Sequence, residues 1–405
     1  MFSNRTNWHL AQNALTRALN EVRASGQEIF DLTISNPTEA EVRPDAEAVL
    51  GALVNPAALR YDPQPRGLLE ARRAVCRYYR EAHRVFDLDP ERIVLTTSTS
   101  EAYSYVFRLL CNPGDEILVP KPSYPLFEFL ADLSDVKLIP YPLIYDHGWQ
   151  IDFHAMEGAI TPRTRGIIVV NPNNPTGHYV KPEELTMLNE ICGARDLALI
   201  ADEVFLDFAH ETNGVRRDPL KAPRPKNGSE KKPGSLCANA GALTFTMSGL
   251  SKISGLPQMK AAWLVTSGPE PLKKQALERI EVIADTYLSM NAPIQLALPT
   301  FLDQRHGFQK QVLTRVKRNL GELDRQLMVR KSCTRLEVEG GWYAIVRVPA
   351  TRTDDELAVD LLTKKGIYVH PGHFYDFAKD GHLIVSLIMP EREFAEGCRQ
   401  LLSMF

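Results

Sequence analysis

The chain has 405 residues, of which 44% are hydrophobic and 24% charged, and its formal net charge is −3. This length allows two domains, and the composition is that of an ordinary globular protein. The balanced charge predicts neither nucleic acid nor a membrane surface as a partner, and no apolar run approaches the roughly 20 residues of a membrane span. Six scattered cysteines and a polar start without a signal segment favour a cytoplasmic location. His370 and His373 have no third ligand at motif spacing, so we expect no metal.

The first 300 residues have the pattern of an α/β fold. One helical pattern covers 8–25, and an extended segment then stops at Pro37. Apolar runs typical of buried strands follow at 92–97, 116–120, 136–142, 166–170, 197–202, 243–248 and 261–265. Helical stretches alternate with them at 67–84, 100–111, 123–133, 182–195 and 269–287. This alternation predicts a mainly parallel seven-stranded sheet sandwiched by helices.

The rest of the chain predicts a second, smaller domain. Residues 211–240 are rich in Gly, Pro, Lys and Arg, which favours a long flexible insertion over the alternative of a recognition tail. A helical stretch follows to 331, and then short strands alternate with helices, one of them at 353–365. We therefore expect an N-terminal segment (1–50) packed with a small α+β domain (296–405), and a large domain between them (51–295).

The first candidate site motif joins a strand to a helix. Ser98, Thr99 and Ser100 follow an apolar run, and Ser98 with Glu101 has the spacing of a capping box. Free N–H groups and small hydroxyl residues at a helix start suit a phosphate. An ordinary capped helix is the alternative reading.

Two further motifs follow the next strands. The string NPNNPTG (171–177) comes directly after a buried run, where ligands of open α/β sheets bind. Asn173 and Asn174 offer amides there, although a rigid turn would use the same residues. Asp202 ends the following apolar strand, and an acid in that place needs either a partner or solvent.

The fourth motif is a lysine in a Gly/Ser-rich loop, SGLSKISG (248–255), where Lys252 follows an apolar run. A lysine forms a Schiff base when its surroundings lower its pKa, although surface lysines are common. Lys260, eight residues further on, is a candidate phosphate contact.

Taken together and in this order, the motifs resemble the class I/II aminotransferases that depend on pyridoxal 5′-phosphate (PLP). NPNNPTG, DEVF (202–205) and SGLSK (248–252) are the specific parts, and YDPQPRG (61–67) and PSYPLFE (122–128) match two more family segments. The resemblance covers nearly the whole chain. It implies the aspartate aminotransferase-like fold, with PLP in the large domain.

The resemblance also implies a role for each matching residue. Lys252 would carry PLP as a Schiff base and move the substrate proton, Asp202 would pair with the pyridine nitrogen, and Asn174 would bond the phenolic oxygen. Ser98, Thr99 and Ser100 would hold the phosphate, and Tyr124 would stack on the ring. Tyr61, and with it Ser289, would reach the phosphate of a neighbouring subunit, which implies a homodimer with shared active sites. Asn36 would lie near the substrate.

Three positions depart from the family pattern. Phe205 stands where a tyrosine is usual, Lys260 where an arginine is usual, and Val385 where we expect the arginine that binds the substrate carboxylate. Arg347 is a candidate substitute for that arginine, and a surface arginine is the alternative. Trp342 could line the substrate pocket or belong to the core.

The resemblance implies reversible transfer of an amino group from an amino acid to a 2-oxo acid. A lyase or cyclase of the same fold, of the β-elimination or cyclopropane-forming type, remains the alternative, since the cofactor motifs are shared and the carboxylate-binding arginine is missing. A transcription regulator with this fold would need a DNA-binding module ahead of it, for which the first 40 residues leave no room.

Overall fold

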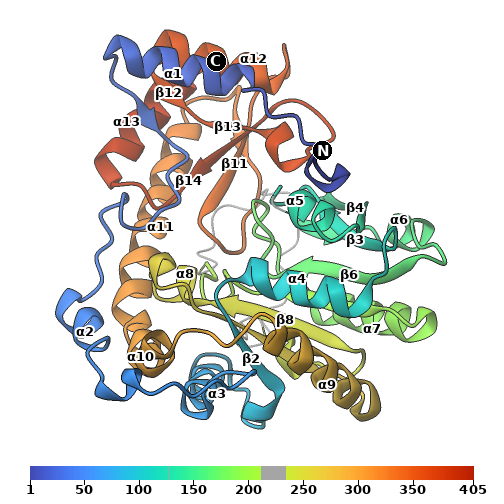
Figure 1. The fold of residues 1–405 in the computed structure, drawn as a ribbon. Coiled ribbons are helices and arrows are strands. Elements are labelled where there is room, and N and C mark those ends of the chain that lie inside the picture. The colour runs from blue at the N-terminus through green and yellow to red at the C-terminus, as the bar shows by residue number, and fades with distance from the viewer. Residues whose placement is uncertain (126, 211–233) are drawn as a thin grey trace, which may run out of the picture.

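The computed structural model describes residues 1–125, 127–210 and 234–405 (Figure 1). Its largest element is an eight-stranded sheet in the order β2-β9-β8-β7-β6-β3-β4-β5. The pairs from β8 through β7, β6 and β3 to β4 are parallel, whereas β9 runs antiparallel to both neighbours and β5 is an antiparallel edge strand. The strands are β2 Ile93–Thr96, β3 Glu116–Lys121, β4 Lys137–Tyr145, β5 Trp149–Ile151, β6 Thr164–Val170, β7 Ala198–Asp202, β8 Thr244–Gly249 and β9 Ala262–Ser267.

Helices cover both faces of this sheet because its central strands are apolar on both sides. On β6, Ile168 and Val170 pack in one cluster with α4, α5 and α9, while Ile167 and Val169 pack in another with α6 and α7. On that second face α3 and α10 cover β2 and β9. These helices are α3 Leu69–His83, α4 Thr99–Leu110, α5 Phe127–Asp132, α6 Phe153–Gly158, α7 Pro182–Arg195, α9 Glu270–Thr286 and α10 Ala292–Asp303.

A smaller sheet lies above the large one in Figure 1, in the order β10-β11-β14-β13. Its strands are β10 Thr334–Arg335, β11 Tyr343–Arg347, β13 His370–Pro371 and β14 His382–Ser386. The N-terminal segment joins this part of the molecule, since β1 (Phe30–Asp31) pairs with β12 (Ile367–Tyr368). Helices α1 (Ala14–Ser25), α12 (Asp354–Lys365) and α13 (Glu391–Leu402) lie around it.

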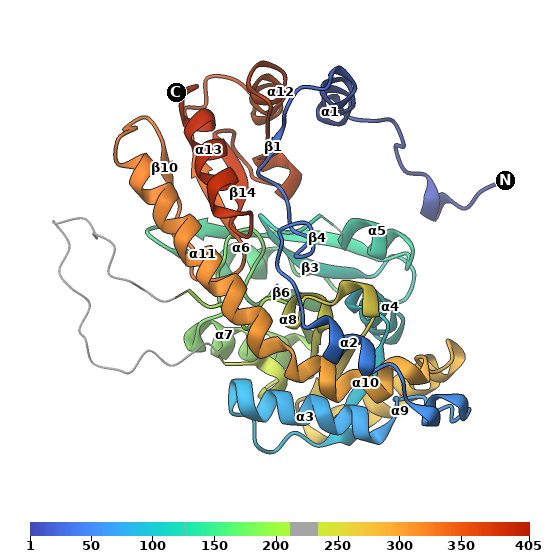
Figure 2. The ribbon, with the colours of Figure 1, turned by 90° about the vertical axis from the view of Figure 1, so that its left-hand side faces the viewer.

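One long helix, α11 (Arg305–Leu327), runs along both sheet regions, as Figure 2 shows in the turned view. Its first turns lie near α8 (Leu250–Ile253) and α10, and its later turns pack against α13 and β10. Helix α11 therefore contacts both the large-sheet region and the small-sheet region.

The α/β architecture predicted from the sequence is confirmed, with four differences in detail. The large sheet has an eighth strand, β5, whose three residues are too short for a periodic pattern. The bounds of two helical stretches also differ: the stretch from 300 to 331 belongs to two helices that meet at Gln304, and the first helix begins at Ala14 rather than residue 8. The short helices α2 (Ala46–Gly51) and α6 were not expected.

The fourth difference concerns the predicted insertion at 211–240. Residues 211–233 lie outside the described part of the chain. The described end of the insertion is ordered, because a 3-10 turn at Leu236–Ala238 buries Leu236 and Cys237 in the core. The flexible insertion predicted from composition is therefore too long at its C-terminal end.

Within the described residues, no helix is both long enough and apolar enough to cross a membrane.

Candidate active site

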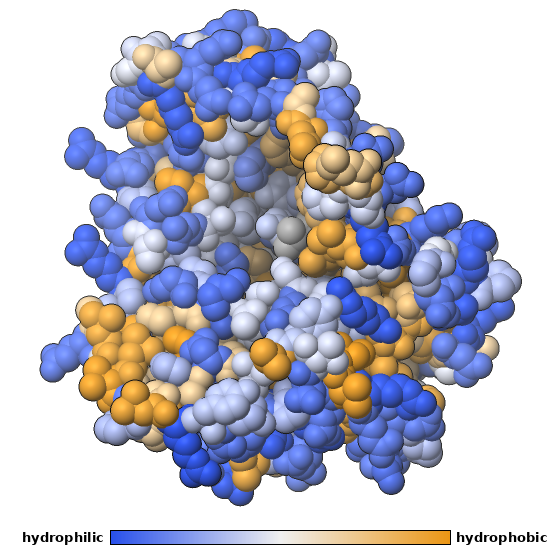
Figure 3. All heavy atoms as spheres, viewed as in Figure 1, coloured by the Kyte–Doolittle hydropathy of each residue, from blue (hydrophilic) through white to orange (hydrophobic). Residues whose placement is uncertain are grey.

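The predicted site residues meet along one edge of the large sheet. Strands β2, β3, β6, β7 and β8 all have the same direction, so their carboxyl ends face the same way. Ser98 follows β2, Tyr124 follows β3, Asn174 follows β6, Asp202 ends β7 and Lys252 follows β8. This is the edge at which open α/β sheets bind ligands. On the face drawn in Figure 3, the molecule is hollowed between the parts that carry the two sheets.

Lys252 lies on α8 in aromatic surroundings. Its Nζ atom lies 4.9 Å from the centroid of the Trp342 ring and 5.5 Å from that of Phe205. Burial lowers the pKa of Lys252 from 10.5 to about 8, because the charged ammonium loses its water. A neutral amine is the form that attacks a carbonyl carbon, so the lowered pKa increases the fraction of Lys252 in the reactive form.

Asp202 ends β7 with a carboxylate that is only 8% exposed. It accepts hydrogen bonds from the Tyr103 hydroxyl at 3.1 Å and from the backbone N–H of Val204 at 3.1 Å. Burial raises the pKa of Asp202 to about 6, and the two hydrogen bonds act in the opposite direction. Within the described residues no cation pairs with it. A ligand that brings a buried positive charge would complete this site.

The Asn loop lies beside Asp202, since the Asn171 backbone N–H donates to the Asp202 carbonyl oxygen at 2.7 Å. The side-chain oxygens of Asn171 and Asn173 already have donors, because they accept hydrogen bonds from the Val180 N–H and the Thr176 hydroxyl. Among the described residues, the buried Oδ1 atom of Asn174 has no partner. Asn174 is therefore the loop amide left available to a ligand.

The start of α4 supplies donors without intrahelical partners. Ser98 is the N-cap, and its Oγ atom accepts from the Glu101 N–H at 3.2 Å. The predicted capping box is only half right, because the Glu101 carboxylate accepts from the N–H and hydroxyl of Thr97 rather than from Ser98. The first N–H groups of a helix have no acceptor within it, so those of Thr99 and Ser100 can face an anion.

Four other predicted cofactor contacts lie in more open places. The side chain of Tyr124 is 44% exposed and that of Tyr61 is 81% exposed. Lys260 is exposed at the end of the turn after α8, with a positive φ of 51°. Ser289 is half-buried in the turn that follows α9. The cofactor roles of these four residues stay predictions.

The candidate substrate residues separate into two groups. Trp342 is fully buried directly before β11, packs edge-on against Phe205 with ring centroids 5.2 Å apart, and faces Lys252. Its indole N–H has no partner among the described residues. Trp342 is therefore a core residue and also lines the lysine site. The amide of Asn36 is engaged locally, since it bonds Thr38 and Glu39.

Arg347 does not join this site. It is exposed at the opposite end of β11 from Trp342, five residues and thus roughly 16 Å away. Val385 is fully buried in β14 opposite Ala344, and no residue of β14 is an arginine. The placement argues against Arg347 as the substitute for the missing arginine and favours the surface reading.

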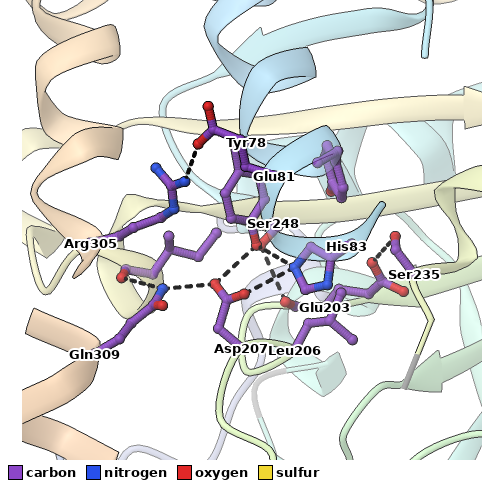
Figure 4. A network of polar contacts seen from close by, with 12 residues as sticks. Tyr78, Glu81, His83, Glu203, Leu206, Asp207, Ser235, Ser248, Arg305 and Gln309 are labelled. Carbon is purple, nitrogen blue, oxygen red and sulfur yellow. Dashed lines mark hydrogen bonds and ion pairs between the residues drawn. The ribbon is translucent and has the colours of Figure 1, made fainter. Parts of the chain in front are cut away.

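The sequence did not single out a second buried polar cluster behind the site. Figure 4 shows Tyr78, His83, Glu203 and Asp207 in it, together with Gln309 from α11. The string ADEVFLD (201–207) places three acids within six positions after a buried strand, and that density was the available signal. Glu203 is 1% exposed, and burial raises its pKa to about 7.

Comparison with known proteins agrees with this geometry. The chain matches the family described as aminotransferase class I and II over residues 27–401. It is 31% identical to the glutamate-pyruvate aminotransferase of Escherichia coli over 278 residues, which cover 68% of this chain and 64% of that protein. It is 28% identical to the alanine aminotransferase of Mycobacterium tuberculosis over 391 residues, which cover 94% and 86% of the two chains.

Solved structures show the same fold. An alanine aminotransferase from Pyrococcus furiosus is 24% identical and superposes with a TM-score of 0.86 over 100% of this chain and 99% of the other. An aspartate aminotransferase from Thermus thermophilus bound to maleate is 20% identical, with a TM-score of 0.79 over 100% of both. The chain belongs to the class I and II aminotransferases, which are PLP-dependent.

The residues present fit PLP. The cofactor has a phosphate, a protonated ring nitrogen, a phenolic oxygen and an aldehyde carbon. The start of α4 suits the phosphate, and the buried Asp202 carboxylate, which has no cation, suits the ring nitrogen. The unpaired amide end of Asn174 suits the phenolic oxygen, and the desolvated amine of Lys252 suits the aldehyde carbon. The Asn174 amide can present its N–H to the phenolic oxygen after a half turn.

Proposed function

We propose that this protein transfers amino groups between an amino acid and a 2-oxo acid, with PLP held by Lys252, Asp202, Asn174 and the start of α4. The observation that carries the proposal is that three groups lie on adjacent strand ends: a desolvated amine, a buried acid without a cation and a buried amide with an unpaired oxygen. Each of them lacks in the protein what PLP would supply.

When bound, PLP supplies an electron sink for charge that develops on the substrate α-carbon. In this proposal the Nζ atom of Lys252 takes the proton from that carbon, which requires the neutral amine. A pKa of about 8 leaves a usable neutral fraction near pH 7, whereas an ordinary lysine would have almost none.

The ionised carboxylate of Asp202 would pair with the protonated ring nitrogen. The Tyr103 hydroxyl and the Val204 N–H fix the orientation of this carboxylate from the protein side. Trp342 and Phe205 pack around Lys252 and limit its contact with water, which disfavours the charged amine and increases its neutral fraction.

Alanine and glutamate are the amino donors we propose first, with pyruvate or 2-oxoglutarate as acceptor. Relatives named glutamate-pyruvate aminotransferase and alanine aminotransferase support this choice. The chain spans 64% of the length of the Escherichia coli relative, so the substrates remain a proposal.

We propose a homodimer that completes each active site with Tyr61 of the neighbouring subunit. An apolar surface around Tyr61 supports this, and part of it is the orange patch over α2 at the lower left of Figure 3. Its exposed residues before α3 are Leu50, Val54, Leu59 and Tyr61. Light scattering coupled to size-exclusion chromatography tests the dimer, and a monomeric holoprotein would contradict it.

We also propose residues 51–295 as the PLP-binding domain and 296–405, with 1–50, as the small domain. The pairing of β1 with β12 and the confinement of the large sheet to 93–267 support these boundaries. We propose a cytoplasmic location because all six cysteines are free thiols, which is typical of a reducing compartment.

The test is the absorbance spectrum of the protein with PLP, recorded with each donor and without an acceptor. Stoichiometric conversion of the PLP band to the pyridoxamine band by alanine or glutamate is the expected result. Continuous release of a 2-oxo acid and ammonia, with the PLP band restored, would establish the lyase alternative instead. The Lys252→Ala variant should show neither change.

A further inference from the structure

The turn that carries Lys252 needs support from outside itself. Helix α8 has only four residues, Leu250–Ile253, so its last carbonyl groups have no partner within the helix. The Ile253 carbonyl oxygen, in the residue next to Lys252, accepts a hydrogen bond from the Gln309 Nε2 atom at 3.1 Å. Gln309 therefore provides the C-terminal cap of this turn from α11.

The same amide nitrogen has a second acceptor. It donates to the Oδ2 atom of Asp207 at 2.9 Å, so both of its N–H bonds are used (Figure 4). An amide turned the other way would place its oxygen against two acceptors, so the orientation of Gln309 is set by chemistry. The amide bridges the lysine turn and a buried carboxylate.

Asp207 is a rigid anchor for that bridge. Its side chain is 5% exposed, and besides Gln309 it contacts the His83 Nε2 atom at 2.9 Å and the Tyr78 hydroxyl at 3.0 Å. His83 is the last residue of α3 and Tyr78 lies in the same helix, which covers one face of the large sheet. Three donors from two helices hold this carboxylate in one orientation.

The residue before Gln309 reinforces the contact. A side chain at Gly255, which has a positive φ of 65°, would meet the ring of Phe308 at 2.3 Å. Phe308 also packs against Trp342, with ring centroids 6.3 Å apart. The start of α11 thus contacts the lysine turn in two ways: Phe308 packs against Gly255, and Gln309 donates a hydrogen bond to Ile253.

We propose that Gln309 is a positioning residue for Lys252: it ties the lysine turn to the Asp207–His83–Tyr78 cluster and so holds the amine inside its aromatic surroundings. The inference rests on the proposed role of Lys252 in PLP binding. It assigns a function to a cluster that is not among the residues proposed to hold PLP.

The test measures the Lys252 amine in the protein without PLP. Competitive acylation with acetic anhydride across pH, read peptide by peptide by mass spectrometry, gives the pH midpoint at which Lys252 becomes reactive. Gln309→Leu, which has a similar volume and no donor, should raise that midpoint by about one pH unit, since a looser turn lets water reach the amine. With PLP bound, kcat should fall about tenfold with little change in KM.

Two further variants separate positioning from general stability. Gln309→Lys keeps donors for both acceptors, and its midpoint should not rise. Gln311→Leu is the matched control, because Gln311 lies on the same helix but is exposed and bonds only backbone oxygens of Arg43 and Gly307. Its midpoint should equal that of the wild type.

A Gln309→Leu protein with a lower melting temperature but an unchanged Lys252 midpoint would overturn the proposal, because its role would then be only structural. If that variant does not fold, Gln309→Asn, whose shorter side chain cannot span both acceptors, carries the same expectation. The acylation readout requires no catalysis. If Lys252→Ala retained transaminase activity, the proposed function would fail while the positioning result stayed measurable.

Discussion

The Nζ atom of Lys252 lies 4.9 Å from the centroid of the Trp342 ring, which itself is fully buried. This contact is favourable for a cation, whereas burial acts in the opposite direction and lowers the pKa of Lys252 to about 8. The folded state therefore binds a proton at Lys252 less strongly than the unfolded chain does. As a result, the charged form of Lys252 lowers the free energy of unfolding.

We therefore predict that Lys252→Met stabilises the protein without PLP. Between about pH 8 and pH 10.5 the unfolded state binds more protons than the folded state, so wild-type stability rises with pH in this window. The gain from the substitution should be on the order of 3 kcal/mol below pH 8 and should shrink toward zero near pH 10.5. Urea unfolding of both proteins at pH 7 and pH 10 measures it.

The exposed Lys260 is the control for this experiment. Lys260→Met removes an equal charge from an open place, and its effect should be small at both pH values. A stabilisation by Lys252→Met that stayed the same at pH 7 and pH 10 would contradict the desolvation argument, since it would come from packing alone.

Phe205→Tyr should restore a hydroxyl beside the cofactor. Phe205 is 5% exposed and packs against both Trp342 and Lys252, so a tyrosine there would bring a donor near the phenolic oxygen of PLP. Stabilising the charged form of that oxygen should lower the pH midpoint of the bound-PLP absorbance change. Phe205→Leu keeps the site apolar, and its midpoint should not fall. A titration without a downward shift in Phe205→Tyr would refute this role.

Strand-level features of the fold were predictable, whereas contacts between distant segments were not. The boundaries of α7 at Pro182 and Arg195 match the expected 182–195, because proline suits the first helical position and the apolar run of β6 precedes it. Asp202 and Asn174 could be proposed because buried strands end at them. Gln309, by contrast, is one polar residue on a long amphipathic helix, and nothing local marks it as the partner of Ile253 and Asp207.

The same distinction explains the substrate side of the site. Trp342 faces Lys252 although the two are 90 residues apart in sequence, and only the packing of β11 against the large sheet shows it. Arg347 ends the strand that begins directly after Trp342, and sequence alone cannot say which end of this strand faces the lysine. The alternation of residues along a strand predicts which face of the sheet a side chain lies on. It does not predict which end of the strand lies near the site.

Asp202 should make PLP binding depend on pH. Its carboxyl group has a raised pKa of about 6, and the ionised form is the one that pairs with a protonated ring nitrogen, so affinity should fall as the pH drops through about 6. Tyr103→Phe removes a hydrogen bond that favours the ionised form, and the fall should move to higher pH. Equilibrium dialysis of PLP across pH measures this shift.

Tyr105→Phe is the matched control, since Tyr105 is buried on the same helix but packs against Tyr287 instead of Asp202. Its pH curve should coincide with that of the wild type. Equal curves for Tyr103→Phe and Tyr105→Phe would mean that the Tyr103 hydroxyl does not affect the pKa of Asp202.

Asp202→Asn should lose about 10²–10³-fold in kcat, because a neutral amide cannot balance the charge of the ring nitrogen.

Lys260 is the position where the strength of phosphate binding should be adjustable. An ammonium is a compact point charge, whereas a guanidinium offers a planar fork that matches a phosphate with two parallel hydrogen bonds. If Lys260 faces the cofactor phosphate, Lys260→Ala should raise the dissociation constant of PLP by about tenfold, and Lys260→Arg should lower it. Both effects should weaken at high salt, because the residue is exposed. Lys274→Ala removes an exposed lysine from α9 and should leave the constant unchanged. Equal dissociation constants for Lys260→Ala and Lys274→Ala would place Lys260 outside the phosphate site, and the first turn of α4 would then bind the phosphate without it.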